Sequence, residues 1–335
     1  MHRDAGKPIV GGKVPVVALS LLLITFAGIR YGTGSDYFLY TSLYRAIIPH
    51  SLADSLAVVP QELGWVTLSF LLRGYTNSPY LLLWLASIMT IVPVLIAIRR
   101  QTKDPTLAVF LFFFLGYYAL TFNAVRQSIA VSFLLLADSY RQESRLKCLL
   151  FSAIAVLFHS SALIAILVQL IAMRWKPTWV SVVIVLALGA LGSYFLLQSG
   201  LAGALASSLN PRYETYLDDE GAGLGTWLVL AVRILLIVFA MAAPASKETS
   251  RYIAFVTISA VVLLLGTTNV VIARFEPYFG IFLILLLPNV LMNSRNSVLL
   301  RWTLMLGSLI YFGFYILSFN GVVPYRVIPE LTSMN

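Results

Sequence analysis

Charged residues are scarce in this sequence. They make up 11% of its 335 residues, whereas hydrophobic residues make up 59%. A soluble domain carries about 25% charged and about 45–50% apolar residues. A soluble fold of this composition could not cover its own apolar surface, so a soluble enzyme is excluded. Cys148 is the only cysteine, which excludes a disulfide scaffold, and the high apolar content excludes a disordered chain.

Sequence signatures of nucleotide and metal sites are also missing. There is no Walker sequence, no Cys/His metal spacing and no Gly-rich dinucleotide loop, which argues against an ATP-driven pump, a zinc protease and a redox enzyme. We therefore expect neither a metal nor a cofactor. The first apolar run has a basic flank but no small-residue cleavage site after it, so we expect a retained helix and not a signal peptide.

Long apolar runs are what the sequence has in abundance. A helix needs about 20 apolar residues to cross a bilayer. Two runs, 124–140 and 148–172, carry polar residues, and the stretch 62–72 is too short to span comfortably. The pattern predicts one all-α polytopic membrane domain over residues 1–335, a helical bundle of about 9–11 transmembrane segments counting a re-entrant hairpin. The clearest runs are 14–29, 79–98, 105–122, 178–197, 226–243, 252–271, 277–292 and 302–319.

The basic residues predict which loops lie in the cytoplasm, because short cytoplasmic loops are enriched in lysine and arginine. Clusters follow or precede most apolar runs: Arg3, Lys7 and Lys13; Arg99, Arg100 and Lys103; Arg141, Arg145 and Lys147; Arg174 and Lys176; Lys247 and Arg251; Arg295 and Arg301. With these loops inside, the N-terminus is cytoplasmic, the C-terminus is outside, and residues 30–61 and 198–225 form outer loops. Residues 62–72 are then interfacial or re-entrant. Residues 148–172 either form a hairpin bent at 158–161 or cross as one straight span, and the two interpretations have equal weight.

The net charge of +9 divides by side of the membrane. The inner clusters contain every lysine, whereas the basic residues predicted outside are arginines. Arginine's planar guanidinium can hold a phosphate with two hydrogen bonds and stays charged when partly desolvated. This distribution points away from nucleic acid and towards an anionic partner on the outer side.

Arg126 is the clearest candidate for binding such an anion. Asn123, Arg126 and Gln127 are spaced three and four apart and are expected to share one helical face. The start of a helix also presents backbone N–H groups to an anion. The simpler alternative is an arginine that reaches to the outer headgroups.

Two further groups stand out in apolar surroundings. His159, next to two serines at the expected bend, could transfer a proton or donate to a phosphate, or it could simply bond a backbone carbonyl. Arg274 and Tyr278 face the same way if their helix is continuous, with Glu276 between them. For this pair, function and headgroup contact are equally good interpretations.

The outer loop 30–61 contains a carboxylate among aromatic residues. Asp36 is followed by Tyr37, Tyr40 and Tyr44, whose spacing places them on one helical face. Aromatic rings with a carboxylate are suited to holding sugars, although a membrane-interface tyrosine belt explains the same pattern. Glu62 is either a second carboxylate of the site or an acid at a helix start.

Several motifs, in order along the chain, resemble those of a known family. The strongest are Asn123-Ala124-Val125-Arg126-Gln127-Ser128-Ile129-Ala130 and Phe158-His159-Ser160-Ser161-Ala162-Leu163, and weaker ones are Gly34-Ser35-Asp36 with Tyr40 and Tyr44, Glu62-Leu63-Gly64, Arg274 with Tyr278, and Pro324-Tyr325. On these residues the sequence resembles the EpsG family of bacterial exopolysaccharide membrane proteins, which belongs with Wzy-like repeat-unit polymerases. The resemblance runs from Arg30 to Tyr325.

The resemblance implies a metal-independent glycosyltransferase, similar to the lipid-donor glycosyltransferases. Such an enzyme transfers a glycan chain from undecaprenyl diphosphate to a lipid-linked acceptor on the outer face of the bacterial plasma membrane. The implied partners are the undecaprenyl-diphosphate-linked oligosaccharide, the lipid bilayer and other polysaccharide export proteins, and no nucleic acid is expected.

Residue roles follow from this reaction. The diphosphate is expected to bind Arg126, Gln127, Arg274 and Arg212, of which Arg212 matches no motif and rests on its chemistry alone. Arg126 would also stabilise the charge that develops as the glycosidic bond breaks. Asp36 is expected to accept the proton of the acceptor hydroxyl, with Glu62 or His159 as alternatives. The candidate sugar-binding residues are Tyr37, Tyr40, Tyr44, Glu62 and Tyr278.

Four other functions remain open on the sequence. A glycan ligase would need nearly the same residues but would make a single transfer, and a glycosyltransferase could use polyprenyl-phosphate sugars. A lipid-oligosaccharide transporter should carry charges along a cavity reaching both faces, whereas here Asp138 is the main charged exception to an outer cluster. A scaffold of an export complex would tolerate neutral substitutions at Arg126 and Asp36.

Overall fold

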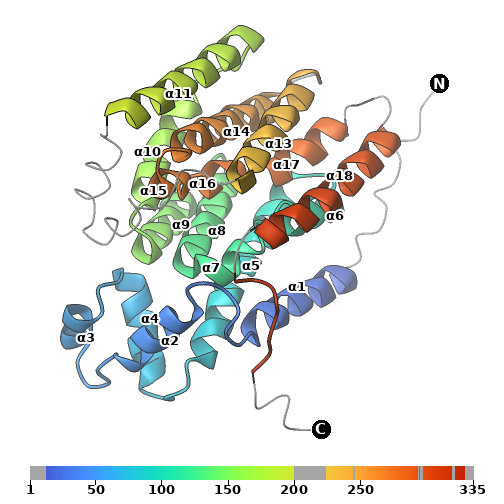
Figure 1. Ribbon diagram of the computed structural model, residues 1–335. Coiled ribbons are helices and arrows are strands. Elements are labelled where there is room, and N and C mark those ends of the chain that lie inside the picture. The colour runs from blue at the N-terminus through green and yellow to red at the C-terminus, as the bar shows by residue number, and fades with distance from the viewer. Residues whose placement is uncertain are drawn as a thin grey trace. The chain divides into compact units, whose positions relative to one another are not determined.

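The computed structural model describes residues 13–199, 224–243, 246–292, 294, 297–318 and 321–328. Within these ranges all regular secondary structure is helical, apart from one isolated antiparallel bridge between Arg30 and Val327. Five of the described helices are long and apolar enough to cross a membrane, and shorter apolar helices accompany them (Figure 1). The prediction of an all-α, polytopic membrane fold is therefore confirmed.

The described residues group into two compact units. Unit 1 comprises residues 13–109, 118–160 and 321–328, and unit 2 comprises residues 110–117 and the described residues from 161 to 318. The prediction of a single polytopic domain over residues 1–335 stays a prediction.

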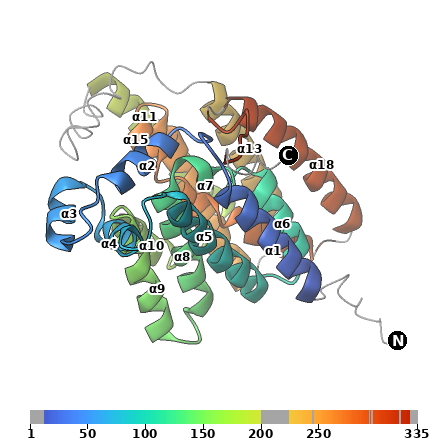
Figure 2. The ribbon, with the colours of Figure 1, turned by 90° about the horizontal axis from the view of Figure 1, so that it is seen from below.

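Unit 1 is built on the long helix α5. This helix packs against α1 on one side and α8 on the other, and α8 packs along α9 (Figure 2). The helices of unit 1 are α1 (Lys13–Gly28), α2 (Tyr37–Arg45), α3 (Leu52–Val58), α4 (Leu63–Arg73), α5 (Tyr80–Gln101), α7 (Leu120–Asn123), α8 (Val125–Tyr140) and α9 (Arg145–Phe158), with the beginning of α6 (Pro105–Phe114).

The short helix α4 joins several parts of unit 1. It contacts α2, α3, α5 and α9, and its Trp65 is buried in a core shared with Tyr40, Leu82, Ile129 and Phe158. An 11-residue helix rises about 16 Å, roughly half the thickness of the hydrocarbon core. This length supports the prediction that residues 62–72 do not cross the membrane.

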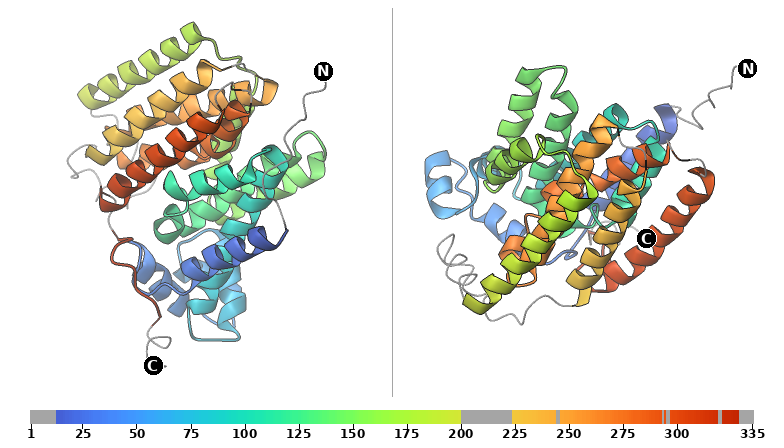
Figure 3. Two further views of the ribbon diagram at one scale, coloured as in Figure 1. Left: turned by 90° about the vertical axis from the view of Figure 1, so that its right-hand side faces the viewer. Right: turned by 90° about the horizontal axis from the view of Figure 1, so that it is seen from above.

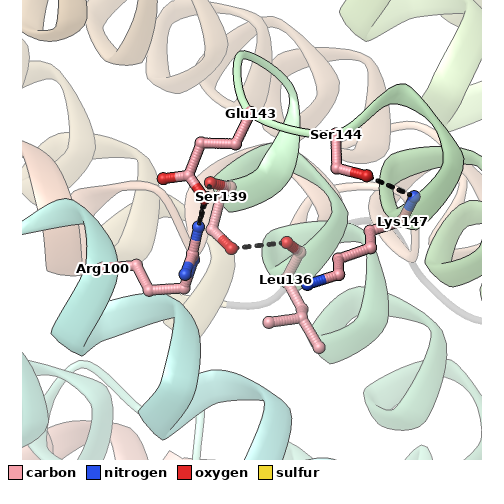
Figure 4. Close-up of polar contacts among 6 residues, drawn as sticks. All are labelled: Arg100, Leu136, Ser139, Glu143, Ser144 and Lys147. Carbon is pink, nitrogen blue, oxygen red and sulfur yellow. Dashed lines mark hydrogen bonds and ion pairs between the residues drawn. The ribbon is translucent and has the colours of Figure 1, made fainter.

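Two basic clusters meet where α8 turns into α9. Arg100, near the end of α5, forms an ion pair with Glu143 in this turn (Figure 4). The Arg100 guanidinium lies 3.8 Å and the Lys147 ammonium 4.8 Å from the centre of the Tyr140 ring. Ser144 caps α9 by accepting a hydrogen bond from the backbone N–H of Lys147. Residues predicted on the same side of the membrane are thus neighbours in unit 1.

Unit 2 is centred on α14. This helix packs along α11 and α13 (Figure 3) and contacts α10 and the three short helices that precede the last one. The helices of unit 2 are α10 (Ala162–Ala172), α11 (Trp179–Ser199), α13 (Leu224–Met241), α14 (Lys247–Gly266), α15 (Val270–Ala273), α16 (Pro277–Gly280), α17 (Leu283–Leu291) and α18 (Ser297–Ser318), with the end of α6.

Three apolar runs are interrupted. Residues 105–122, expected as one span, divide into α6 and α7 because Gly116 has a φ of 87°, a conformation that ends a helix and favours glycine. Residues 270–291 contain turns that separate α15, α16 and α17, although Val271–Leu291 as a whole is one of the five stretches long and apolar enough to cross a membrane. The break expected at 158–161 is present between α9 and α10. Whether α9 and α10 form a hairpin or a straight span stays a prediction.

Candidate functional site

Glu62 is the centre of a polar cluster in unit 1. It occupies the N-cap position of α4 with an extended backbone, so its side chain leaves the helix at its first turn. One carboxylate oxygen, Oε1, lies 2.7 Å from His159 Nδ1 and accepts a hydrogen bond of 3.3 Å from the backbone N–H of Ser160. The other, Oε2, forms an ion pair with Arg126. Glu62 was one of several candidates on the sequence, and the structure gives it a central position.

Arg126 reaches this cluster from the first turn of α8. The helix begins after Ala124, whose backbone is not helical (φ −108°, ψ 60°). Asn123 is therefore the last residue of α7 and does not share a helical face with Arg126, contrary to the expectation from their spacing. The Arg126 side chain remains 18% exposed, whereas Gln127 is buried. A partly exposed guanidinium at a helix start is well suited to an anion.

His159 reaches the cluster from the end of α9. It is the C-cap residue, with an extended backbone (φ −156°, ψ 113°), and its side chain is 23% exposed. An ionised carboxylate can only accept a hydrogen bond, so Nδ1 carries a proton and donates it to Glu62. This leaves Nε2 as the ring nitrogen with a lone pair that can take up a proton.

Asp36 lies in a tight turn that packs on the same part of unit 1. Gly34 in this turn has a φ of 101°, and an added Cβ would lie 2.1 Å from the carbonyl oxygen of Phe122. The next backbone N–H, of Ser35, donates to Asn123 Oδ1 over 3.0 Å. The Asp36 carboxylate accepts a hydrogen bond of 3.1 Å from Ser35 Oγ. The turn thus joins the start of α2 to the α7–α8 junction that positions Arg126.

The three tyrosines of α2 lie in the protein interior. Tyr37, Tyr40 and Tyr44 are 2%, 4% and 1% exposed. Burial raises the pKa of Tyr37 to about 12. Burial also raises the pKa of Tyr40, and the neighbouring Arg126 guanidinium partly offsets this. The three rings are thus covered by protein, and Tyr40 is the one that neighbours Arg126. The expectation that these tyrosines stack on sugars stays a prediction.

Arg30, expected on the outer side, is also covered. It is 1% exposed, and burial lowers its pKa to about 10. Its guanidinium lies 5.2 Å from the centre of the Phe122 ring and donates to the carbonyl of Ala27. The segment 321–328 lies beside it, with Tyr31 N–H donating to the Arg326 carbonyl over 2.8 Å. Arg30 therefore helps to seat this segment on unit 1.

In unit 2, Arg274 and Tyr278 differ in exposure. Arg274 follows the last residue of α15 and is exposed, whereas Tyr278 lies in α16 and is 1% exposed. Residues 274–276 form turns between α15 and α16 within the helical stretch Val271–Leu291, and whether Arg274 and Tyr278 act together stays a prediction. The Tyr278 hydroxyl lies 3.0 Å from Ser161 Oγ, and its carbonyl accepts a hydrogen bond from Gln169. Tyr278 is thus buried and hydrogen-bonded within unit 2, and its expected role in sugar binding stays a prediction.

Sequence reasoning missed the partner of Glu276. This carboxylate forms a buried ion pair with Arg233 of α13, whose Nη2 lies 2.5 Å from Glu276 Oε1. The same guanidinium donates to the Tyr117 hydroxyl over 2.8 Å and to the Gly280 carbonyl over 3.2 Å. The signal was present, because an arginine in an apolar helix needs a partner, but the partner is 43 residues away.

Two other expectations concern Arg212 in the loop 198–225 and the presence of a metal site. Arg212 and nearly all of loop 198–225 lie outside the described residues. Among the residues that are described, no three His, Cys, Asp or Glu side chains gather in a way that could hold a metal ion.

The fold and the clusters define a class of protein: a polytopic helical membrane protein with ionised groups gathered at helix ends. A family model identifies the protein more specifically than this class. The model of the EpsG family matches residues 13–327, nearly the whole chain, and the chain belongs to this family. The family is associated with exopolysaccharide biosynthesis, which gives the chain a general role in making polysaccharide. Comparisons with curated proteins and with solved structures give no match.

Proposed function

We propose that this protein is a repeat-unit polymerase, a glycosyltransferase that moves a glycan chain from undecaprenyl diphosphate to a lipid-linked acceptor. The observation that carries the proposal is the Glu62–Arg126–His159 cluster, which combines a guanidinium with a carboxylate–imidazole pair in a membrane protein of the EpsG family. A diphosphate leaving group needs a permanent cation, and an attacking hydroxyl needs a base.

The proposed reaction breaks one bond and makes one. The acceptor hydroxyl oxygen attacks the anomeric carbon of the donor, and the bond from that carbon to the diphosphate oxygen breaks. The electron pair leaves with undecaprenyl diphosphate, whose growing negative charge Arg126 stabilises. The hydroxyl proton passes to a base of the cluster, and a new glycosidic bond remains.

The proposed location is the outer face of the bacterial inner membrane, with the N-terminus cytoplasmic and the C-terminus outside. Arg126 lies in the first turn of α8 and His159 follows α9, whereas Arg141 and Arg145 lie at the opposite ends of the same helices. The 16 residues of α8 separate these ends by about 24 Å. If the basic end faces the cytoplasm, the Glu62 cluster lies towards the outer side.

The remaining sequence candidates keep separate roles in the proposal. Arg274 of unit 2 is exposed and, with Arg212, is proposed as a further diphosphate ligand. Gln127 is buried behind Arg126 and is proposed to support it. Other polysaccharide export proteins are proposed partners of the whole chain.

Reconstitution in proteoliposomes with a lipid-linked repeat unit tests the proposal. A polymerase releases undecaprenyl diphosphate and makes a ladder of repeat lengths, whereas a single transfer product indicates a ligase, and no covalent product indicates a transporter or scaffold. Arg126→Lys keeps the charge but loses the two-pronged grip, so it should slow ladder formation by about tenfold to hundredfold. Arg45→Lys, at an exposed arginine of α2, is the matched control. Full-rate polymerisation by properly inserted Arg126→Lys contradicts the bidentate role.

A further inference from the structure

The carboxylate of Glu62 is shared between two partners of different kinds. Its Oε1 faces the His159 ring and its Oε2 faces the Arg126 guanidinium. A carboxylate beside an imidazole stabilises the protonated ring and so makes the ring a stronger base. A guanidinium bound to the same carboxylate opposes that effect, because its positive charge cancels much of the carboxylate's field.

Arg126 has capacity for a second anion. Its side chain stays 18% exposed while it pairs with Glu62 and neighbours Tyr40, and its buried Nε makes no hydrogen bond to any described residue. A diphosphate carries more negative charge than a carboxylate and can take two parallel N–H donors from one guanidinium. An arriving diphosphate therefore competes with Glu62 for Arg126.

We propose that Glu62 couples donor binding to proton transfer: the donor diphosphate draws Arg126 away from Glu62, and the released carboxylate strengthens His159 as the base. Nε2 of His159 then takes the proton of the acceptor hydroxyl, and Nδ1 stays hydrogen-bonded to Glu62. Glu62 acts as a positioning and gating residue. This inference rests on the proposed function, because it assigns regulation to the same site. The coupling would make His159 a strong base only when a donor is present to react.

Few other ionisable groups of unit 1 surround this cluster. Tyr40 of α2 neighbours Arg126, and Asp36 at the start of α2 neighbours Tyr40. Arg73 lies at the far end of α4. The charged residues of α5, α8 and α9 lie at their other ends: Arg99, Arg100, Asp138, Arg141, Arg145 and Lys147. Glu62 contacts His159 directly and Arg126 contacts Glu62, so both groups contribute to the field at His159.

The test follows the protonation of His159 directly, without turnover. The full chain in nanodiscs is treated with diethylpyrocarbonate, which modifies neutral imidazole, and the rate at His159 is measured by mass spectrometry from pH 5 to pH 9. Inorganic pyrophosphate serves as the probe for the donor diphosphate. We expect it to raise the pH midpoint of modification at His159 by about one unit. The exposed His50 is the internal control, and its midpoint should not move.

Variants distinguish an effect that is transmitted through Glu62 from a direct electrostatic effect of Arg126 or of pyrophosphate on His159. Arg126→Gln should raise the midpoint without pyrophosphate, because it frees the carboxylate. Glu62→Gln should abolish most of the pyrophosphate effect and most of the Arg126→Gln effect. Simple repulsion between Arg126 and His159 predicts instead that the two substitutions add.

The outcomes are distinct. Slower modification at every pH with an unchanged midpoint means that pyrophosphate only covers His159, and additive variants mean that Arg126 acts directly; either result overturns the proposal. The polymerase assignment is judged separately by the product ladder. A ladder with no midpoint shift rejects the gating alone, whereas a shift without a ladder supports the gating by Glu62 and rejects the polymerase assignment.

Discussion

At the scale of single residues, the choice of base distinguishes His159 from Asp36. His159 has a carboxylate on Nδ1 and a second ring nitrogen to accept a proton, whereas Asp36 bonds to the neighbouring Ser35 hydroxyl. We expect His159→Gln to slow polymerisation by about 10²- to 10⁴-fold and Asp36→Asn to have a smaller effect. Initial rates of ladder formation by matched amounts of each variant measure this, and the reverse order would return the role to Asp36.

The same residues show which features of the site could be predicted from the sequence alone. It singled out Arg126 and His159 as unusual in apolar surroundings, and both lie in the cluster. It could not pair them with Glu62, because the contacts span 97 residues between Glu62 and His159 and no local rule carries that far. Spacing also placed Tyr37, Tyr40 and Tyr44 on one face, but spacing alone does not say whether that face points to solvent or to the core.

At the scale of elements, the Gly34 turn is predicted to be intolerant of a side chain. Gly34→Ala would place a residue with a Cβ at a φ of 101° and against the Phe122 carbonyl, which should cost about 1–3 kcal/mol of stability. Gly307→Ala in α18 is the control, because nothing lies within 4 Å of an added Cβ there. Thermal unfolding in detergent should show a lower Tm for Gly34→Ala alone. Equal Tm values for the two variants would contradict this role of the turn.

The buried Arg233–Glu276 pair is predicted to hold the interrupted segment 270–291 in unit 2. Removing one charge, as in Glu276→Gln, leaves the other buried without compensation and should cost about 3–5 kcal/mol. Arg233→Met together with Glu276→Gln should cost less than the sum of the single changes. Tm values of the two single variants and the double variant measure the coupling. Additive losses would mean that the two side chains act independently.

The interruptions of helices mark the limit of sequence reasoning about elements. The bend at Phe158–Ser161 was predicted from a histidine and two serines in an apolar run. The break at Gly116 was not, because one glycine in an apolar run is compatible with a continuous helix. The boundary at Ala124 lies where the runs 105–122 and 124–140 were expected to meet. The non-helical backbone of Ala124 (φ −108°, ψ 60°) arises where residues far apart in sequence meet, as Ser35 and Asn123 do.

At the scale of the whole molecule, the predicted topology rests on the separation of charge along α8 and α9. The basic end of this pair holds Arg100, Glu143 and Lys147 (Figure 4), and the other end holds the Glu62 cluster. Opposite ends of two helices of 14 and 16 residues lie about 21–24 Å apart. That distance is a large part of the hydrocarbon thickness of about 30 Å, so the two ends should face different compartments.

Single cysteines in a Cys148→Ala background test this arrangement and decide between the two interpretations of residues 148–172. Ala53→Cys should react with a membrane-impermeant maleimide in intact spheroplasts, whereas Gln142→Cys should react only after permeabilisation; both positions are exposed in unit 1. Labelling of both from outside would contradict the predicted topology.

Thr178→Cys, just before α11, reports on the hairpin. Because Arg174 and Lys176 favour the cytoplasm, we expect Thr178→Cys to stay unlabelled until permeabilisation, whereas outside labelling would show that α9 and α10 cross the membrane as one span.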